Sequence, residues 1–298
     1  MIVLTPPVGA PGFYEMTAAE YHADPCPIPS LSASIAKKLL RQTPKHAWAA
    51  HPRLCAQIPD DPTPAMLFGS VVHKLVLGAG ARIKVIDAED YRSKDAQRAR
   101  DLALASGRLP ILAKKFDEAD LIAEHVRTRV QRAAPRMFTG RPELVAIWQE
   151  GDVWCRAMMD SYQLAGGLAL IDDLKTSGQD ISPLGVGKTI ANMGYEIQAA
   201  FYSLASLRLA PDAMPTFRFA FAETEPPYEA SIVELTGAAF EIGRRQVSAA
   251  IELWRRCLKS NEWPGYPDTP IRADLPPWHV GSWEQREQDD PLLEGVSY

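Results

Sequence analysis

The chain has 298 residues, of which 46% are hydrophobic and 23% are charged. This composition is typical of a globular protein that buries one large core or two small ones. The formal net charge is −5, which excludes nucleic-acid binding by overall attraction and would require a local basic patch. The four cysteines show no CxxC spacing, which indicates reduced thiols rather than a disulfide framework or a zinc site. No apolar run approaches the ~20 residues of a membrane span, and no basic signal region is present, so we expect a cytoplasmic protein.

The first part of the sequence predicts one extended segment and one basic helix. Residues 1–30 are rich in proline, which favours an extended N-terminal segment. A helix is expected over residues 31–40, with Ser32 or Ser34 as its N-cap. Lysines such as Lys38 make this helix basic, and they either form a solvated face or contact DNA phosphates.

Three further helices are expected before the first long strand. Prolines and paired aspartates predict a loop at 52–64, followed by an apolar helix over 66–77 that carries His73. A histidine among valines and leucines, taken alone, is more often a core residue than a metal ligand. Residues 91–106 predict a polar helix, and the spacing of apolar residues predicts a long amphipathic helix over 112–133.

From residue 143 the hydrophobic period changes to that of β-strands. A meander of three strands is expected over 143–149, 153–162 and 168–175, joined by short turns that contain glycine. The next elements, in chain order, are a helix over 194–209, strands over 216–223 and 229–235, and a helix over 238–258. Residues 266–298 are rich in tryptophan and proline and show little periodicity. They predict an irregular tail that lies along the surface or on a neighbouring subunit.

Charged side chains follow the second and third of these strands. Residues two apart on a strand share a face, so Asp173 and Lys175 point to one side while Asp172 and Leu174 point to the other. Asp160 lies near the end of the adjacent strand. Two carboxylates can hold Mg²⁺, and a nearby lysine can position or activate a metal-bound water. The pattern predicts a metal-dependent phosphodiesterase site.

Four motifs in this order resemble those of a known superfamily, the RecB-like branch of the PD-(D/E)xK nucleases. In chain order they are Gly69-Ser70-Val71-Val72-His73, Asp160, Asp173-Leu174-Lys175, and Gln198 with Tyr202 one helical turn later. The strongest likeness is to the RecE-like phage exonucleases, over roughly residues 28 to 265. The resemblance implies an α/β fold with an αβββαβ core, in which a central mixed sheet is flanked by helices and carries helical N-terminal additions. The nuclease domain would span residues 31–265.

The resemblance also implies roles at the site. Asp160 and Asp173 would be the central ligands of two Mg²⁺ ions, with Mn²⁺ as a substitute. His73 and the backbone carbonyl of Leu174 would be further ligands. Lys175 would hold the attacking water and help to deprotonate it, its pKa lowered by the positive field of the metals.

Residues around the motifs are assigned supporting roles. Gln198 and Tyr202 would together orient Lys175 and the scissile phosphate. Glu143, at the start of the first strand, is either an outer-sphere acid or extra ligand, or an exposed residue at a strand end. Asp172 is expected to point outward or to lie behind the metal ligands.

Four residues are candidates for contact with DNA. Arg156 lies four residues before Asp160 on the same strand face and could contact a phosphate. Ser34 and Lys38 lie on the basic N-terminal helix, and similar basic segments occur in RecE-like nucleases. Lys188 lies in a glycine-containing segment after the DxK strand that could contact the DNA backbone.

These motifs together predict a Mg²⁺-dependent exodeoxyribonuclease that degrades linear duplex DNA from the 5′ end and leaves 3′ single strands. By resemblance, its partners would be double-stranded DNA ends and a RecT-like single-strand annealing protein, and the chain would form a homo-oligomeric ring. Two alternatives stay open. One is a structure-specific or restriction-type endonuclease on the same core, and the other is a non-catalytic DNA-binding or assembly module.

Overall fold

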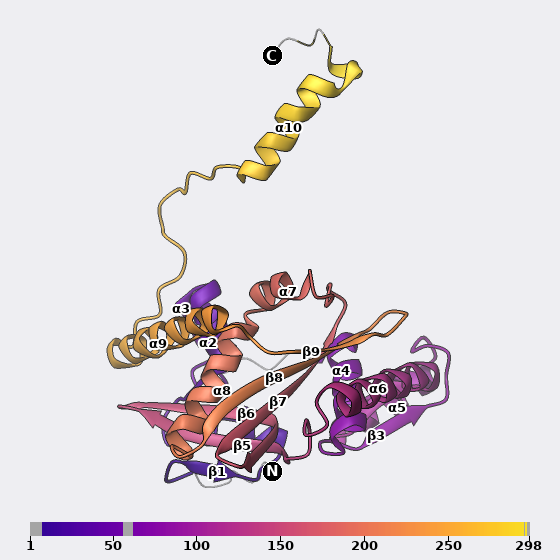
Figure 1. Cartoon of the computed structure of the whole chain (residues 1–298), viewed down its shortest axis with the longest axis vertical. Helices are drawn as coiled ribbons and strands as arrows, with labels where there is room; N and C mark the ends of the chain where they lie inside the picture. The colour runs from indigo at the N-terminus through magenta and orange to yellow at the C-terminus, as the bar shows by residue number, and fades with distance from the viewer. Residues whose placement is uncertain (1–7, 56–61, 295, 297–298) are drawn as a thin grey trace. The chain divides into compact units, whose positions relative to one another are not determined.

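A computed structural model describes residues 8–55, 62–294 and 296 of the chain (Figure 1). The contacts divide the chain into two compact units, Met1–Pro264 and Gly265–Tyr298, and each is described by itself below. The first residues of the expected N-terminal segment and much of the expected loop at 52–64 lie outside the described residues.

The described part of the first unit is built around a mixed seven-stranded sheet (Figure 1). Its strands are β1 (Gly12–Tyr14), β2 (Leu31–Ser32), β5 (Arg141–Glu150), β6 (Val153–Ala165), β7 (Leu168–Ser177), β8 (Met214–Glu223) and β9 (Ala230–Val233). The order across the sheet is β1-β5-β6-β7-β8-β9, and β2 pairs with β6 beside this path. β5, β6 and β7 form the expected antiparallel meander, whereas β7 and β8 are parallel.

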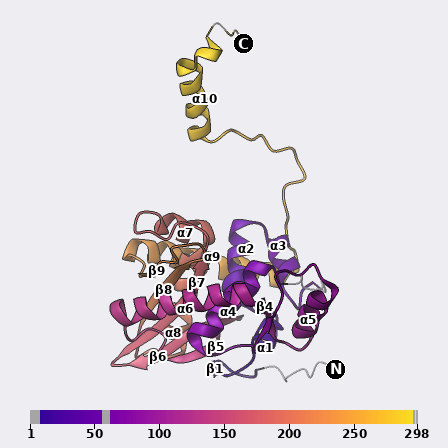
Figure 2. The same cartoon turned by 90° about the vertical axis from the view of Figure 1, so that its right-hand side faces the viewer.

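Helices cover both faces of this sheet (Figures 1 and 2). They are α1 (Ala18–His22), α2 (Ala33–Arg41), α3 (Pro44–Ala50), α4 (Pro64–Leu77), α5 (Lys94–Ala105), α6 (Ala113–Ala133), α7 (Val186–Met193), α8 (Tyr195–Leu209) and α9 (Gly237–Ser260). α2, α8 and α9 pack over one face, in a core that includes Phe201, Phe219 and Trp254. α4 and α6 pack over the other face of β7 and β8, in a second core that includes Val72 and Leu174.

β6 and β7 separate where the candidate metal ligands lie. β6 pairs with β7 only over residues 161–165, and the earlier part of β6 pairs with β2 instead. Beyond Asp172, β7 keeps only β8 as its neighbour. A backbone N–H that leaves a strand ladder needs another acceptor, and the N–H of Leu174 donates to the Asp160 carboxylate at 2.8 Å. This fork in the sheet therefore brings the two strands' functional residues together.

The ends of α4 are set by its sequence. Thr63 is the N-cap and its hydroxyl accepts from the N–H of Met66 at 3.2 Å, while Pro64 occupies the first turn, where no helical N–H is required. Gly78 ends the helix with a φ of 72°, a conformation that favours glycine. The helix is thereby held across the sheet with His73 in its C-terminal half, on the side of the fork.

The mixed α/β fold with helices on both faces of the sheet confirms the prediction from the sequence. Residues 8–30 are not simply extended, however, because they contain β1 and α1. Thr17 and Glu20 form a capping box that stabilises this short helix against its five-residue length. Five further elements were not anticipated: β2, α3, α7, and a separate two-stranded parallel sheet of β3 (Ile83–Ile86) and β4 (Leu109–Leu112).

The second unit corrects the prediction of a wholly irregular tail. It contains α10 (Pro277–Asp289), followed by a single 3₁₀ turn, η1 (Pro291–Leu293). α10 has no buried residue, so no apolar stripe marked it in the sequence. Proline in its first turn and the pair Arg286–Asp290, four residues apart at 3.1 Å, favour the helix locally. Within the described residues, no helix of either unit is both long and apolar enough to span a bilayer.

Candidate active site

The fork holds the two aspartates of the D and DxK motifs. Asp173 is only 2% exposed and lies with Lys175 on the face of β7 that α8 covers. Leu174, between them, points to the opposite face and packs in the second core. Asp160 reaches across the fork through its hydrogen bond to the Leu174 N–H. The DxK strand therefore sends its charged residues and its apolar residue to opposite sides.

Asp173 has partners on both of its oxygens, but they differ in kind. Its Oδ1 accepts a hydrogen bond from Gln198 Nε2 at 2.6 Å. Its Oδ2 is buried and has the Lys175 ammonium as its partner, with Nζ at 2.5 Å. A divalent cation that binds at this oxygen would replace the ammonium as the charge that compensates the buried carboxylate.

The charges at the fork shift each other's titration. Burial raises the pKa of Asp173, the Lys175 ammonium opposes this rise and the Asp160 charge adds to it, and the pKa is about 6. Burial lowers the pKa of Lys175, but the carboxylates of Asp173 and Asp160 outweigh it, so the pKa lies above its ordinary value. Without metal, Lys175 is therefore an ammonium, and added positive charge would be needed to lower its pKa.

His73 comes to the fork from α4. Its Nδ1 lies 3.4 Å from Asp160 Oδ2, and its side chain is 31% exposed. The neighbours Val71 and Val72 are fully buried in the second core. His73 thus leaves the apolar face of the helix and faces the carboxylate, which is the position expected of a ligand rather than of a core residue.

Glu143 lies on β5 next to the same site. It is opposite Asp160, between the pairs Pro142–Ser161 and Leu144–Met159. Burial raises the pKa of Glu143, and the Asp160 charge adds to this rise. Its φ of 49° is rare for a residue with a side chain and marks local strain in β5. Glu143 is therefore part of the acidic cluster at the fork.

Gln198 and Tyr202 both face the sheet from α8, and both are buried. Gln198 fixes Asp173 through its amide. Burial raises the pKa of Tyr202 well above its ordinary value, while a hydrogen bond with Gln198 acts in the opposite direction. The geometry thus makes Gln198 the contact to Asp173 and Tyr202 the support for Gln198, rather than placing both on Lys175.

The donor set at the fork fits a divalent cation. Oxygen ligands are those that Mg²⁺ prefers, and the carboxylates of Asp160 and Asp173 supply them at the fork. Among the described residues, no three His, Cys, Asp or Glu side chains already converge as a complete ligand set, and Asp173 is turned toward Lys175. Asp160, Asp173 and His73 are the side chains that would hold the ion. Leu174 lies between Asp173 and Lys175 on β7.

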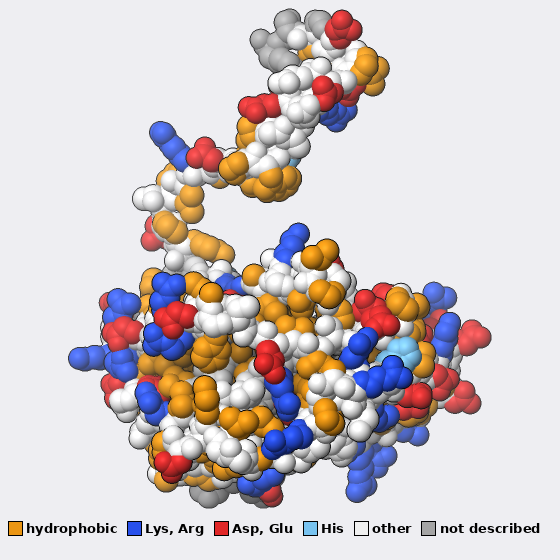
Figure 3. Space-filling model, in the orientation of Figure 1, with side chains coloured by type: hydrophobic (Ala, Val, Ile, Leu, Met, Phe, Trp, Pro, Cys, Tyr) orange, Lys and Arg blue, Asp and Glu red, His pale blue; other side chains and the backbone are white. Residues whose placement is uncertain are grey.

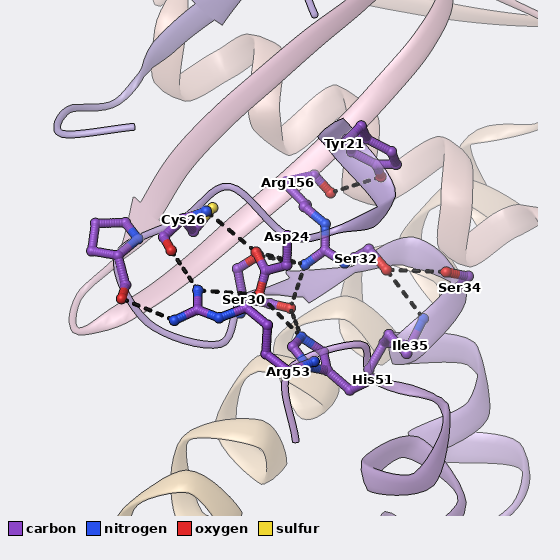
Figure 4. A network of polar contacts seen from close by, with 11 residues as sticks. Tyr21, Asp24, Cys26, Ser30, Ser32, Ser34, Ile35, His51, Arg53 and Arg156 are labelled. Carbon is purple, nitrogen blue, oxygen red and sulfur yellow. Dashed lines mark hydrogen bonds and ion pairs between the residues drawn. The ribbon is translucent and has the colours of Figure 1, made fainter. Parts of the chain in front are cut away.

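Arg156 is held by partners in the N-terminal segment. It is 3% exposed, and its Nη1 donates to the carbonyl and hydroxyl of Ser30 at 2.9 and 2.6 Å (Figure 4). The same nitrogen lies 3.1 Å from Asp24. Because Asp24 is supplied by the N-terminal segment that was expected to be extended, the sequence pattern gave no sign of this partner. Arg156 is thus a buried cation whose Nη1 is taken up by Ser30 and Asp24, although it also lines the hollow that Ser34 and Lys38 line.

The other candidate DNA contacts are on the surface. Ser34 and Lys38 are exposed on α2 and line a hollow of about 580 Å³ beside α3. Lys188 is exposed on α7. These three remain accessible to a ligand, but none of them touches the fork residues through a described contact.

Asp172 does not take the outward position, which was one of the two expected for it. It is 1% exposed and lies 2.6 Å from Arg218 Nη2, on the neighbouring strand β8. Its other oxygen accepts from the N–H of Phe138 at 2.8 Å. Asp172 is therefore a buried structural residue that ties the sheet to the segment before β5.

Two site residues were not singled out from the sequence. Tyr195, at the start of α8, has Lys175 Nζ 5.3 Å from its ring centroid. Lys37, on α2, has its Nζ 5.4 Å from the centroid of the same ring. Lys37 and Arg41 are four residues apart and therefore share one face of the helix, as Ser34 and Lys38 share another. This spacing is the signal in the sequence that could have distinguished the two faces.

Comparison with known proteins places this geometry in a family. Residues 32–269 match the model of a family described as "PDDEXK-like domain of unknown function (DUF3799)". No curated protein matches the chain. Among solved structures, the chain is similar to the crystal structure of a "Putative exonuclease" from Eubacterium rectale, with a TM-score of 0.57 and 16% identity over 90% of this chain and 98% of that chain. The chain therefore belongs to this family of PDDEXK-like domains, and its fold is that of the PD-(D/E)xK nucleases.

Proposed function

We propose that the chain is a Mg²⁺-dependent exodeoxyribonuclease of the RecE-like group that degrades linear duplex DNA from the 5′ end. The observation that carries the proposal is the arrangement of Asp160, Asp173 and Lys175 at the fork, where the lysine ammonium lies 2.5 Å from the buried Asp173 carboxylate and His73 lies 3.4 Å from Asp160. Membership of a PDDEXK-like family supports a phosphodiester hydrolase.

The residues divide the work of hydrolysis between them. Asp160 and Asp173 bind the cation, and His73 completes the side-chain ligands. The resemblance implies two divalent ions, and the oxygen ligands favour Mg²⁺ or Mn²⁺. When bound, these ions would supply positive charge that stabilises the attacking and leaving oxygens. Gln198 holds Asp173 in place. Lys175 orients the water and accepts its proton once its pKa has been lowered.

The charge distribution supports binding of DNA by the first unit. Residues 265–298 contain seven of the 37 acidic residues and two of the 32 basic ones, which leaves thirty of each in the first 264 residues. The net charge of −5 is thus carried entirely by the C-terminal unit. On the face of the first unit in Figure 3, basic and acidic side chains are interspersed. A polyanion is therefore repelled less by the nuclease core than the overall charge suggests.

We further propose that the enzyme works as a homo-oligomeric ring with a RecT-like annealing protein. A ring is built from one heterologous interface repeated around an axis, and it would gather dispersed basic residues around one duplex. The large exposed apolar side chains of the C-terminal unit, such as Trp278 and Trp283, are candidates for that interface. The 3′ single strand left by the enzyme would be the substrate of the annealing protein.

The first experiment compares linear and supercoiled closed-circular duplex DNA in the presence of Mg²⁺. An exonuclease digests the linear molecule and leaves the circle intact, whereas an endonuclease cuts both. A DNA-binding or assembly module cuts neither. Lys175→Ala, assayed beside the wild-type protein, controls for a contaminating nuclease.

Polarity is tested on linear duplex labelled at either the 5′ or the 3′ ends. Early release of the 5′ label alone is expected. Early release of the 3′ label would reject the proposed direction, and release of both labels in step would reject a preference for either end.

A further inference from the structure

Lys37 is a second lysine at the candidate active site. It lies on α2, and its Nζ is 5.4 Å from the centroid of the Tyr195 ring. Lys175 Nζ is 5.3 Å from the same centroid. Two ammonium groups from different elements, one from a helix and one from the DxK strand, are thus held at one aromatic ring beside Asp173.

Lys37 has no direct ion-pair partner. None of the ion pairs among the described residues includes Lys37, whereas Arg41, one turn later, lies 3.9 Å from Glu196 and donates to the carbonyls of Ala191 and Asn192. Burial and the Lys175 charge lower the pKa of Lys37, the carboxylates of Asp173 and Glu196 oppose them, and the pKa is about 8. A lysine kept only for stability would be expected to have a carboxylate partner in such a place.

An anion between the two lysines would give Lys37 the direct partner that it lacks. The nearest carboxylate, Asp173, is already engaged by Lys175 and Gln198. Aromatic rings attract cations but carry no net charge, so Tyr195 can hold both ammonium groups near its ring without neutralising them. Lys37 is therefore open to an anionic ligand at a point that DNA must reach if Lys175 acts on it.

We propose that Lys37 binds a phosphodiester oxygen of the DNA strand that is cut. This inference rests on the proposed nuclease function and adds a substrate-binding residue to it. Lys37 lies outside the four motifs, and its role is to hold a phosphate against Lys175 and the bound cation. Tyr195 keeps the two lysines apart and directs both toward the same anion.

The test uses Lys37→Met, which keeps the apolar stem against Tyr195 and removes the charge. Binding of a linear duplex is measured with Ca²⁺ in place of Mg²⁺ at several salt concentrations. We expect affinity to fall about tenfold, and the slope of log affinity against log salt to decrease by roughly one phosphate contact. With Mg²⁺, the specificity constant for cleavage should fall, while the metal concentration for half-activity stays that of the wild type.

Two further variants separate binding from folding. Lys37→Arg keeps the charge and should retain affinity within about threefold. Lys114→Ala removes an exposed lysine at the start of α6 and should leave affinity and salt dependence unchanged. If Lys37→Met fails to fold, Lys37→Gln is measured in its place, with thermal unfolding as the check.

The outcomes distinguish this inference from the proposed function. Wild-type cleavage with unchanged affinity and salt dependence in a folded Lys37→Met would overturn the role of Lys37 and leave the nuclease proposal standing. Absence of both binding and cleavage by the wild-type protein would instead reject the proposed function.

Discussion

Two buried aspartates that lie beside β6, Asp24 of the N-terminal segment and Asp173 of β7, have very different surroundings. Asp24 lies beside the first half of the strand, where its carboxylate accepts from the N–H and hydroxyl of Ser30 and pairs with Arg156 at 3.1 Å and His51 at 3.3 Å (Figure 4). Asp173, at the fork, has one amide donor and one ammonium. Both aspartates are almost completely buried.

The difference appears in the direction of the two pKa shifts. Burial raises the pKa of Asp24, but hydrogen bonds from His51 and Ser30 and the charge of Arg156 outweigh it, so the pKa lies below its ordinary value. Burial dominates at Asp173 and raises its pKa to about 6. A carboxylate whose partners lower its pKa stabilises the fold at neutral pH, whereas one whose pKa stays raised is kept charged at the expense of stability and points to function.

The largest expected effect is on cleavage. Lys175→Ala should retain metal-dependent DNA binding but lose cleavage by several orders of magnitude, because the lysine acts on the attacking water. Asp173→Ala should lose both, since it removes a metal ligand. Initial rates on linear duplex with Mg²⁺ measure the first effect, and a Lys175→Ala rate above about a tenth of wild type would disprove the assigned role.

The second prediction concerns the network at Asp24. Arg156→Met removes one partner of a buried ion pair and should destabilise the protein by about 3–5 kcal/mol. Urea unfolding measures this loss, and the cleavage rate per folded molecule should stay near that of the wild type. A normal unfolding free energy combined with impaired DNA binding would return Arg156 to the phosphate-binding role predicted from the sequence.

These two networks also show what a sequence can predict. The fork residues were identified because each lies at a fixed spacing within its own strand or helix, as Asp173 and Lys175 do. The partner of Arg156 could not be found in this way, because Asp24 is 132 positions away and comes from a segment without periodicity. Lys37 was expected only as one of several lysines on a basic helix, since its closeness to Lys175 depends on how α2 packs against α8. Local pattern therefore recovers motifs, but not contacts between distant segments.

A third prediction uses the opposite pKa shifts, in protein freed of metal by a chelator. The pKa of Asp173 rises from 3.8 to about 6 on folding, so its contribution to stability is full below pH 3.8 and is lost as the pH rises through about 6. This loss is about 3 kcal/mol. The stability of Asp173→Asn relative to the wild type should therefore rise between pH 4 and pH 7, on top of a constant loss from leaving the Lys175 ammonium without its carboxylate partner.

Asp24 should show the reverse dependence. Its pKa is lowered on folding, so its contribution is present above pH 3.8 and is lost as the pH falls below that value. Asp24→Asn should be destabilised at pH 7, and its deficit should shrink in acid. Urea unfolding across pH 3 to 8 measures both variants, and parallel curves for the two would contradict the contrast between the networks.

A fourth prediction addresses the ligand role of His73. His73→Ala should raise the Mg²⁺ concentration for half-activity by roughly 10- to 100-fold, because Asp160 loses its neighbour at 3.4 Å. The unfolding free energy of the metal-free protein should change little, since the side chain is 31% exposed. An unchanged metal requirement with lowered thermal stability would show that His73 belongs to the core instead.

The smallest expected effect on the nuclease core comes from removing the C-terminal unit. Truncation after Gly265 deletes α10, which buries none of its residues, and two tryptophans, Trp278 and Trp283, that are 73% and 43% exposed. The core should therefore unfold at nearly the same temperature. If the deleted tryptophans dock on a neighbouring subunit, however, the oligomer should dissociate, and a processive enzyme should become distributive or inactive.

Light scattering on the truncated protein and processivity on long linear duplex test this prediction together. The truncation also removes a net charge of −5, which by itself should strengthen DNA binding by the core at low salt. If the truncated protein loses both oligomer mass and processivity, weaker electrostatic attraction to DNA therefore cannot be the cause. The C-terminal unit would then be the assembly element. An unchanged mass with unchanged processivity would eliminate it from that role.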